Sequence, residues 1–340
     1  MLLSGASAGA FAADAPSQRT LRAAAEYSSA RRGFSMLVIH DGRVIFEEYA
    51  NDAKAGDRHK IYSGTKSFWS VAAMCAVGDG VLTLDERVAD TITEWQGDAR
   101  RSRITMRQLL NFTDGIDPAS HTHSDELRDR NGYALHAPVV AAPGAAFLYG
   151  PSHLQIFCEV LRRKLNRQTP FSYLRKKVLD PLGLGGVEYK KDALGNPLMA
   201  SGFKLTARQW ARFGELVLHR GESGGRAIVP GGLLAQCFHG SAACPAFGIG
   251  FWNNTQAAHS DAREFDIEDM LEKKWWQQDW HRACIARGVP ADTIACIGSE
   301  YQRLFVIPSL DLVIVRQGLN AKFRDGDFLR ILLGRGGSAQ

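Results

Sequence analysis

Two pairs of short apolar runs, one near each end of the chain, most constrain what this sequence can fold into. The first pair is "FSMLVIHDGRVIFEEYA", residues 34–50, in which Asp41-Gly42 separates two runs of β-forming residues. An Asp-Gly step suits a tight hairpin turn, which requires positive φ. The second pair is "RLFVIPSLDLVIVRQG", residues 303–318, with its turn at Pro308 to Asp311. We therefore expect both chain ends to form antiparallel strands.

The region between these pairs has apolar residues at the three- and four-residue spacing of helices. It contains "SRITMRQLLNFTDG", "SHLQIFCEVLRRKL", "PFSYLRKKVLDPLG" and "TARQWARFGELVLHRG". The chain has 340 residues, of which 45% are hydrophobic, enough for a sizeable core. We expect an α/β fold of the α+β type, in which an antiparallel sheet flanked by helices is built from both chain ends. Residues 14–77 and 226–340 form this sheet part, and residues 78–225 form an inserted, mainly helical subdomain.

The composition argues against several classes of protein. The net charge of +5 is not gathered in a Lys/Arg block, so nucleic-acid binding is not expected. No run of about 18 apolar residues exists, so no membrane span is expected. Residues 1–13, "MLLSGASAGAFAA", are small and apolar and carry the A-x-A form of a signal-peptidase site. They predict a signal remnant and a periplasmic or secreted protein, with a cytoplasmic location as the alternative.

Six cysteines fit either an oxidising or a reducing compartment. Cys75 and Cys158 fall within expected helices, where buried thiols are the simplest interpretation. The pairs Cys237–Cys244 and Cys284–Cys296 are close enough in sequence to form disulfides in an exported protein. This pairing is a hypothesis, because six cysteines allow many connectivities.

The segment "IYSGTKSFWS" places Ser63 and Lys66 at the head of an expected core helix, whose apolar spacing ends at Gly78 and Gly80. Residues three apart share a helix face, so the lysine amine can reach the serine hydroxyl. Burial and the helix dipole both lower the pKa of a lysine at a helix start, which makes it a usable base. A second Ser-x-x-Lys, Ser201 with Lys204, precedes a helix start and is interpreted as part of a loop.

Two segments have the G-x-S-x-G spelling of another class of serine hydrolase, around Ser7 and Ser223. That motif needs a strand before the serine and a helix after it. Ser7 lies in the expected signal, and Ser223 follows a helix and precedes the strand-like "RAIVP". Neither is therefore expected to be a nucleophile.

The segment "HTHSDE" places His121, His123 and Asp125 in a spacing that zinc hydrolases use. Glu126 stands where such enzymes have a further histidine, and no later region supplies a second ligand cluster. We interpret the segment as a polar loop near the site, and we expect no metal and no other cofactor.

Five motifs occur in the order found in one known family: "IYSGTK", "LLNFTDGI", "PGAAFLYGPSHLQIF", "LDPLGL" and "LFVIPSLDLVIVR". The chain resembles the class C β-lactamase-like serine hydrolases from about residue 30 to its C-terminus. That group includes penicillin-binding carboxypeptidases, esterases and 6-aminohexanoate-dimer hydrolases. The resemblance implies the β-lactamase/transpeptidase-like fold and acyl transfer through an ester on a serine.

The resemblance also implies residue roles. Ser63 is the acylated nucleophile, Lys66 the base that accepts its proton, and Tyr149 the residue that passes a proton to the leaving group. The family's Y-x-N becomes Tyr149-Gly150-Pro151, so the asparagine that would hold Lys66 and a substrate amide is missing. Ser152 is expected to replace part of it.

The third motif of the family, K-T-G or H-x-G, becomes "GSEYQ", residues 298–302. It offers no lysine or histidine to a substrate carboxylate, and Glu300 would repel one. Of the two oxyanion N–H groups, the first is expected from Ser63 and the second, by the resemblance, from Tyr301 or Gln302. Ser299 is expected to contact substrate in the same segment.

An aromatic segment, "REFDIEDMLEKKWWQQDWHR", has no counterpart among these motifs. Its apolar residues share one helical face or lie beside it: Ile267, Met270, Leu271, Trp275, Trp276 and Trp280. Such stripes usually belong to a core. A lid or an apolar substrate wall is the alternative.

The sequence thus predicts a serine hydrolase that acts on a small-molecule ester, amide or peptide. An ester or small amide is favoured, because the groups that grip a lactam amide and its carboxylate are missing. The alternatives are a β-lactamase or D-alanyl-D-alanine carboxypeptidase, and a catalytically inactive periplasmic binding protein.

Overall fold

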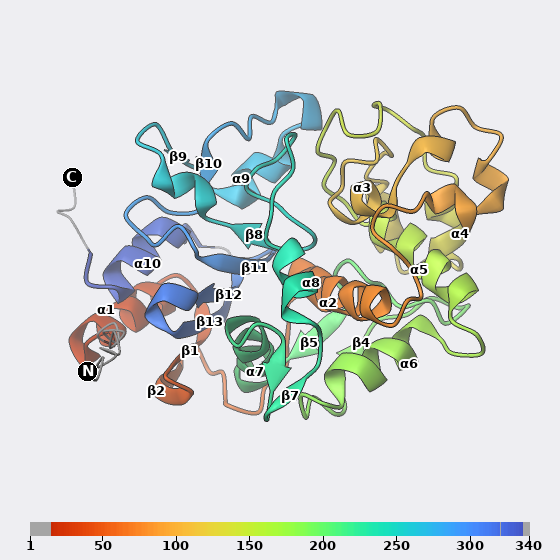
Figure 1. Cartoon of the computed structure of the whole chain (residues 1–340). Coiled ribbons are helices and arrows are strands. Elements are labelled where there is room, and N and C mark those ends of the chain that lie inside the picture. The colour runs from red at the N-terminus through yellow and green to blue at the C-terminus, as the bar shows by residue number, and fades with distance from the viewer. Residues whose placement is uncertain (1–14, 320, 336–340) are drawn as a thin grey trace, which may run out of the picture.

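A computed structural model describes residues 15–319 and 321–335, and its centre is a six-stranded antiparallel sheet (Figure 1). The strand order is β2-β1-β13-β12-β11-β8. The bounds are β1 (Gly33–His40), β2 (Arg43–Tyr49), β8 (Trp252–Asn253), β11 (Ile294–Gly298), β12 (Gln302–Ile307) and β13 (Leu312–Gly318). Strand β1 pairs with β13, so the two chain ends meet within one sheet, as expected.

Both expected hairpins are confirmed. Asp41 and Gly42 join β1 to β2 with φ angles of 49° and 64°, the positive values that the turn requires. Strands β12 and β13 are joined by the 3₁₀ turn η9 (Pro308–Leu310), followed by Asp311 at φ 50°.

Helices cover both faces of this sheet. Arg316 of β13 donates a hydrogen bond to Ser28 Oγ of α1 (Gln18–Ser29), at 3.2 Å. The next residue, Gln317, donates to the carbonyl of Leu205, which lies just before α7 (Ala207–Leu218). Because successive strand residues point to opposite faces, α1 and α7 lie on opposite sides of the sheet. Helix α10 (Asp325–Leu332) packs beside α1.

Helix α7 lies inside the range 78–225 but packs on the sheet. A Cβ on its Gly214 would come within 2.5 Å of Val313 and 2.8 Å of Leu304, so the helix and the strands are in close contact there. The division of the chain at residues 78 and 225 remains a prediction, and α7 is the element of the inserted range that belongs to the sheet layer.

Helix α2 (Thr65–Gly78) runs through the middle of the molecule and ends at the first of the two glycines that the sequence offers as its end (Figure 1). Its residues from Thr65 to Ala76 are all buried, which is typical of a helix that is apolar on every side. The other helices are α3 (Met106–Leu110), α4 (Arg130–Leu135), α5 (Ser152–Lys164), α6 (Pro170–Leu174), α8 (Gly231–Gln236) and α9 (Ile267–Glu272). A π-helical turn, η6 (Arg175–Leu179), continues α6.

Short strands form three further sheets. The three-stranded one has the order β3-β5-β4, from β3 (His59–Lys60), β5 (Phe203–Leu205) and β4 (Glu188–Tyr189). Strands β6 (Glu222–Ser223) and β7 (Arg226–Ala227) form a hairpin, and β9 (Arg263–Glu264) pairs with β10 (Ala283–Cys284). Ser223 thus lies in a hairpin and not between a strand and a helix, in agreement with the sequence analysis. Ser7 and the expected signal remnant, residues 1–13, lie outside the described residues.

The aromatic segment is only partly helical. Helix α9 ends at Glu272, and Trp275 begins the separate 3₁₀ turn η8 (Trp275–Gln277). The side chains of Ile267, Met270 and Trp280 are buried, whereas Trp276 is 65% exposed. The stripe therefore divides into a core part and a surface part.

All six cysteines are buried free thiols, so the hypothesis of two disulfides is not supported. Cys284 lies on β10 and Cys296 on β11, in different sheets, and Cys237 follows α8 while Cys244 lies in a loop. The only argument for these pairs was their closeness in the sequence, and in the fold neither pair forms a disulfide bond.

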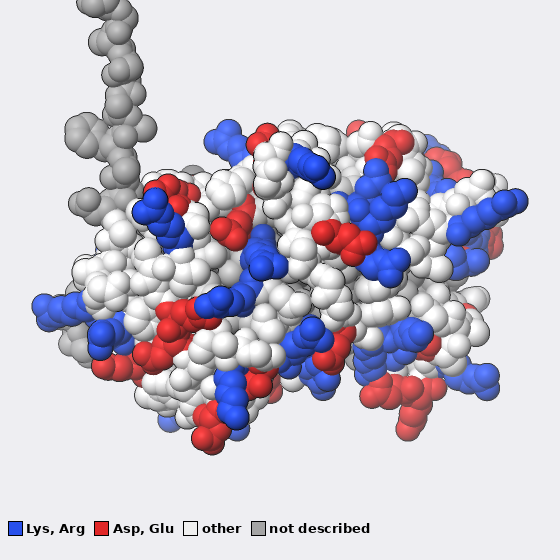
Figure 2. Space-filling view, turned by 90° about the horizontal axis from the view of Figure 1, so that it is seen from below, with Lys and Arg blue, Asp and Glu red and all other residues white. Residues whose placement is uncertain are grey.

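The distribution of charge and the lengths of the helices both bear on expectations from the sequence. Basic and acidic side chains are interspersed on the face that Figure 2 shows, as the spread of charge along the sequence indicates. Within residues 15–319 and 321–335, no helix is both long and apolar enough to cross a membrane.

Candidate active site

Ser63 lies in the short 3₁₀ turn η1 (Tyr62–Gly64), directly before α2. Tyr62 has a φ of 44°, a left-handed conformation that is unfavourable for a residue with a side chain. A Cβ on Gly64 would come within 2.7 Å of the Trp210 ring, so the turn is packed tightly from beneath. Strain of this kind is often found where a fold must present a reactive side chain, and here it presents Ser63 to a cavity.

Lys66 contacts Ser63 directly, as its spacing predicts. Its Nζ donates to Ser63 Oγ at 2.8 Å and to the carbonyl oxygen of Ala200 at 3.0 Å. The side chain is 1% exposed, and burial lowers its pKa to about 7. An amine with such a pKa is partly uncharged at neutral pH, and its uncharged form beside a hydroxyl is the arrangement that general-base catalysis requires.

Tyr149 completes a group of three side chains. Its hydroxyl is hydrogen-bonded to Ser63 and to the indole of Trp252, and Lys66 Nζ lies 4.6 Å from the centre of its ring. Because an indole N–H can only donate, Trp252 donates to the phenol oxygen. Burial raises the pKa of Tyr149 to about 12, so the phenol keeps its proton at neutral pH.

An aromatic cluster fixes the Tyr149 ring. Phe112, Phe247 and Trp252 have ring centres 5.6, 5.6 and 5.8 Å from it, and Phe147 lies at 6.0 Å. The contacts with Phe112 and Phe247 are edge-to-face and the other two are tilted, and together they hold the ring in one orientation. The hydroxyl is therefore held at Ser63 by the packing of the phenol ring.

Ser152 does not take the place of the missing asparagine. It is buried, and its hydroxyl donates to the carbonyl of Asp117 at 2.7 Å, not to Lys66. The reason is the close approach of loop 117–118, since a Cβ on Gly150 would stand 2.3 Å from Pro118. The Ala200 carbonyl holds Lys66 instead. The sequence had no signal for this, because every residue has a carbonyl.

The expectation for Tyr301 and Gln302 is also corrected. The Tyr301 N–H donates to Glu268 Oε1 at 2.8 Å, and the Gln302 backbone pairs with Gly298 in the ladder of β11 and β12. Neither residue lines the cavity that Ser63 faces, whereas Ser299 does. A Cβ on Gly298 would lie 2.0 Å from the Ile61 carbonyl, so only glycine lets β11 approach the turn before Ser63. Gly298 therefore corresponds best to the glycine of the family's third motif. The residue that follows this glycine is Ser299, not Tyr301 or Gln302.

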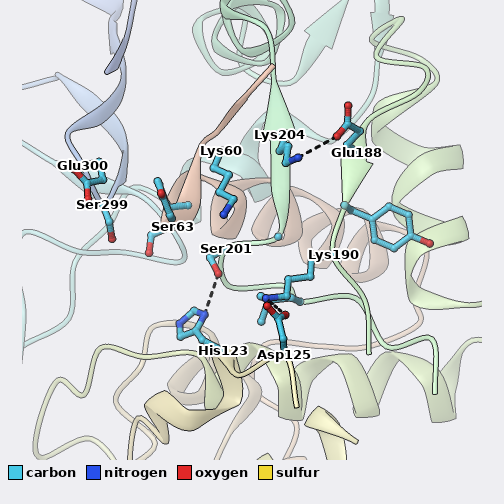
Figure 3. A pocket seen from close by; sticks show the side chains of 14 residues that line it. Lys60, Ser63, His123, Asp125, Glu188, Lys190, Ser201, Lys204, Ser299 and Glu300 are labelled. Carbon is cyan, nitrogen blue, oxygen red and sulfur yellow. Dashed lines mark hydrogen bonds and ion pairs between the residues drawn. The ribbon is translucent and has the colours of Figure 1, made fainter. Parts of the chain in front are cut away.

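The cavity has a volume of about 650 Å³ and receives side chains from several separate segments of the chain (Figure 3). Its lining includes Lys60, Tyr62, Ser63, His123, Asp125, Glu188, Lys190, Ser201, Lys204, Ser299 and Glu300. The "HTHSDE" segment is therefore a polar loop at the site, as expected. Ser201, interpreted from the sequence as a loop serine, and Lys204 of β5 also belong to the wall.

His123 faces Ser201, with 3.0 Å between Nδ1 and Oγ. Burial, and next the charge of Lys66, lower the pKa of His123 to about 4, so the ring is neutral. In the part of the chain that the structure describes, no three His, Cys, Asp or Glu side chains are placed to hold a metal ion. The histidine is a polar wall residue, in the segment that the sequence analysis placed near the site.

Comparison with known proteins gives one family match and several similar solved structures. A family model described as "Beta-lactamase" matches residues 18–247. A search of the curated proteins found no match. Among solved structures, EstCE1, "a hydrolase with promiscuous acyltransferase activity", is 17% identical with a TM-score of 0.67, over 94% of this chain and 98% of that one.

Two further structures are similar over nearly their whole length. The D-stereospecific amidohydrolase from Streptomyces sp. is 14% identical with a TM-score of 0.66, over 95% of this chain and 100% of that one. The penicillin-binding protein homologue from Caulobacter crescentus is 15% identical with a TM-score of 0.65, over 94% and 97%. At such identities these structures establish the fold.

Proposed function

Since the chain belongs to the beta-lactamase family and is a serine hydrolase, we propose that it cleaves a small ester or amide through an acyl-enzyme on Ser63. The observation that carries this proposal is the buried Lys66 amine, which has a pKa of about 7 and lies 2.8 Å from the Ser63 hydroxyl. A buried lysine lowers stability when it must carry a charge, so its position here is best explained by chemistry.

The first half of the reaction forms the acyl-enzyme. Neutral Lys66 accepts the proton of Ser63 while Oγ bonds to the substrate carbonyl carbon. When the tetrahedral intermediate collapses, the bond to the leaving alkoxide or amine breaks and Tyr149 gives that group a proton. The proton that Lys66 accepted then passes to the Tyr149 phenolate and restores the phenol, since Nζ lies 4.6 Å from the centre of that ring.

The second half releases the acid. A water molecule replaces the leaving group, gives one proton to the same Lys66 and Tyr149 pair, and attacks the ester carbonyl. The bond between Ser63 Oγ and the acyl carbon breaks, and Oγ regains its proton. No cofactor is needed in this scheme, because every proton transfer uses a side chain already at the site.

The N–H groups of Ser63 and Ser299 are the proposed oxyanion donors. Support comes from Gly298, whose contact with the Ile61 carbonyl brings Ser299 beside the nucleophile. Two backbone donors fixed by strand β11 and turn η1 need little rearrangement as charge develops on the carbonyl oxygen.

An ester or small amide remains the favoured substrate class. Pro151 has no side-chain amide with which to hold a substrate amide, as an asparagine would. The leaving group takes its proton from the Tyr149 phenol. A β-lactamase or carboxypeptidase is the alternative. A protein that only binds ligand would have no use for an uncharged lysine at Ser63. A periplasmic or secreted location is part of the proposal.

The test is covalent labelling with a fluorophosphonate probe followed by peptide mapping. We expect the label on Ser63 and none in Ser63→Ala. Ser201→Ala is the matched control, since Ser201 lines the same cavity and also has a lysine three residues later. Label on Ser201, or label that persists in Ser63→Ala, would reject the proposal. Faster turnover of penicillins than of p-nitrophenyl esters would favour the β-lactamase alternative.

A further inference from the structure

Two lysines lie directly opposite each other on the wall of the cavity. Lys60 of β3 pairs with Lys204 of β5 in antiparallel register, and both side chains line the cavity. Figure 3 shows them side by side above Ser201. Like charges in directly opposed positions destabilise a sheet. A pair of this kind in a functional cavity calls for an explanation.

The neighbouring acidic residues compensate only one of the two lysines. Lys204 Nζ lies 3.4 Å from a Glu188 oxygen across the next strand pair, and Arg58 lies 3.3 Å from the other oxygen of Glu188. Lys60 has no ion pair among the described residues. The charge of Lys60 helps to lower the pKa of Asp125, but the Asp125 carboxylate already forms an ion pair with Lys190.

We infer that Lys60 binds a carboxylate of the substrate, an inference that rests on the proposed function and adds a substrate class to it. An anion held between Lys60 and Lys204 would remove their repulsion and make charge-assisted hydrogen bonds. Lys60 thus supplies, from another strand, the cation that residues 298–302 lack.

Lys60 lies close to Ser63 along the chain, and both side chains line the same cavity. It precedes Ser63 by three residues, so their Cα atoms are at most about 10 Å apart. The half-esters of short dicarboxylic acids, whose carboxylate and ester carbonyl are a few bonds apart, are therefore the substrate class that we propose for the two groups.

The binding test uses Ser63→Ala protein, so that no turnover occurs, and two probes of similar shape. Monomethyl glutarate carries one carboxylate, and dimethyl glutarate is its neutral counterpart. By calorimetry, we expect the charged probe to bind about tenfold more tightly at low salt, a preference that high salt reduces. Adding Lys60→Met should abolish the preference. Adding Lys54→Met, which removes an exposed lysine outside the cavity, should leave it in place.

The kinetic test compares the p-nitrophenyl half-ester of glutarate with p-nitrophenyl butyrate. In the wild-type protein the ratio of their kcat/KM values should exceed one, and in Lys60→Met it should fall by about tenfold. The same ratio in both proteins, together with equal binding of the two glutarate probes, would overturn the inference. A protein that shows the binding preference but hydrolyses neither ester would refute the proposed function and leave the carboxylate site standing.

Discussion

At the scale of the residue, the protonation state of Lys66 decides whether the site works. Only its neutral form can accept the Ser63 proton, and burial lowers the pKa of the amine to about 7. We therefore expect kcat/KM for p-nitrophenyl acetate to rise with pH through about 7 and then to level off, because Tyr149, with a pKa of about 12, stays protonated. His123 has a pKa of about 4, so His123→Gln should leave the midpoint near 7. A midpoint near 4 or 10 would contradict this assignment.

Stability gives a second measurement of the same group, independent of activity. The unfolded chain holds the Lys66 proton up to about pH 10.4, whereas the folded chain loses it near 7. Between these values the unfolded state binds more protons, so the free energy of unfolding rises with pH. Lys66→Met removes this dependence. The Tm of the wild type relative to this variant should increase from pH 7 to 10. A constant difference in Tm would show that the pKa of Lys66 is not shifted.

At the scale of the element, the aromatic segment is anchored by one tryptophan and leaves another in solvent. The ring centre of Trp280 lies 5.4 Å from that of Trp252 and 5.5 Å from that of Phe147, in the cluster that holds Tyr149. The side chain of Trp276, in contrast, is 65% exposed. Trp280→Ala should lower the free energy of unfolding by about 3–5 kcal/mol. Trp276→Ala, the matched control, should change it by less than about 0.5 kcal/mol. Urea denaturation followed by circular dichroism measures both.

The same pair of variants decides between a core and a lid for this segment. If η8 closes over substrate, Trp276→Ala would change kcat/KM while stability stays the same. If the segment serves only the core, Trp280→Ala alone would matter, through stability and through the support it gives Trp252.

At the scale of the whole molecule, both ends of the chain share one buried core, which contains five of the six thiols, and the sixth, Cys284, is also buried. Burial raises the pKa of each, to about 12 for Cys75, Cys158 and Cys296 and to about 11 for Cys284. We expect Ellman's reagent to titrate none in the native protein and six in guanidinium without reductant. Four thiols or fewer in the denatured protein would restore the disulfide hypothesis.

The sequence alone determined those features that depend on neighbours along the chain. The turn at Asp41-Gly42, the extent of α2 and the reach of Lys66 to Ser63 all follow from local spacing and backbone preference. The family motifs added Tyr149, whose approach to Ser63 spans many residues. These predictions succeeded because periodicity and turn chemistry are encoded residue by residue.

Only the tertiary structure decided which groups meet Ser63 from elsewhere. The Ala200 carbonyl at Lys66 has no signature in a sequence, because every residue has a carbonyl. Ser299, and not Tyr301, reaches the cavity because Gly298 fits against Ile61, a contact between distant segments. Lys60 meets Lys204 through the register of β3 and β5, and register depends on how strands pair in space.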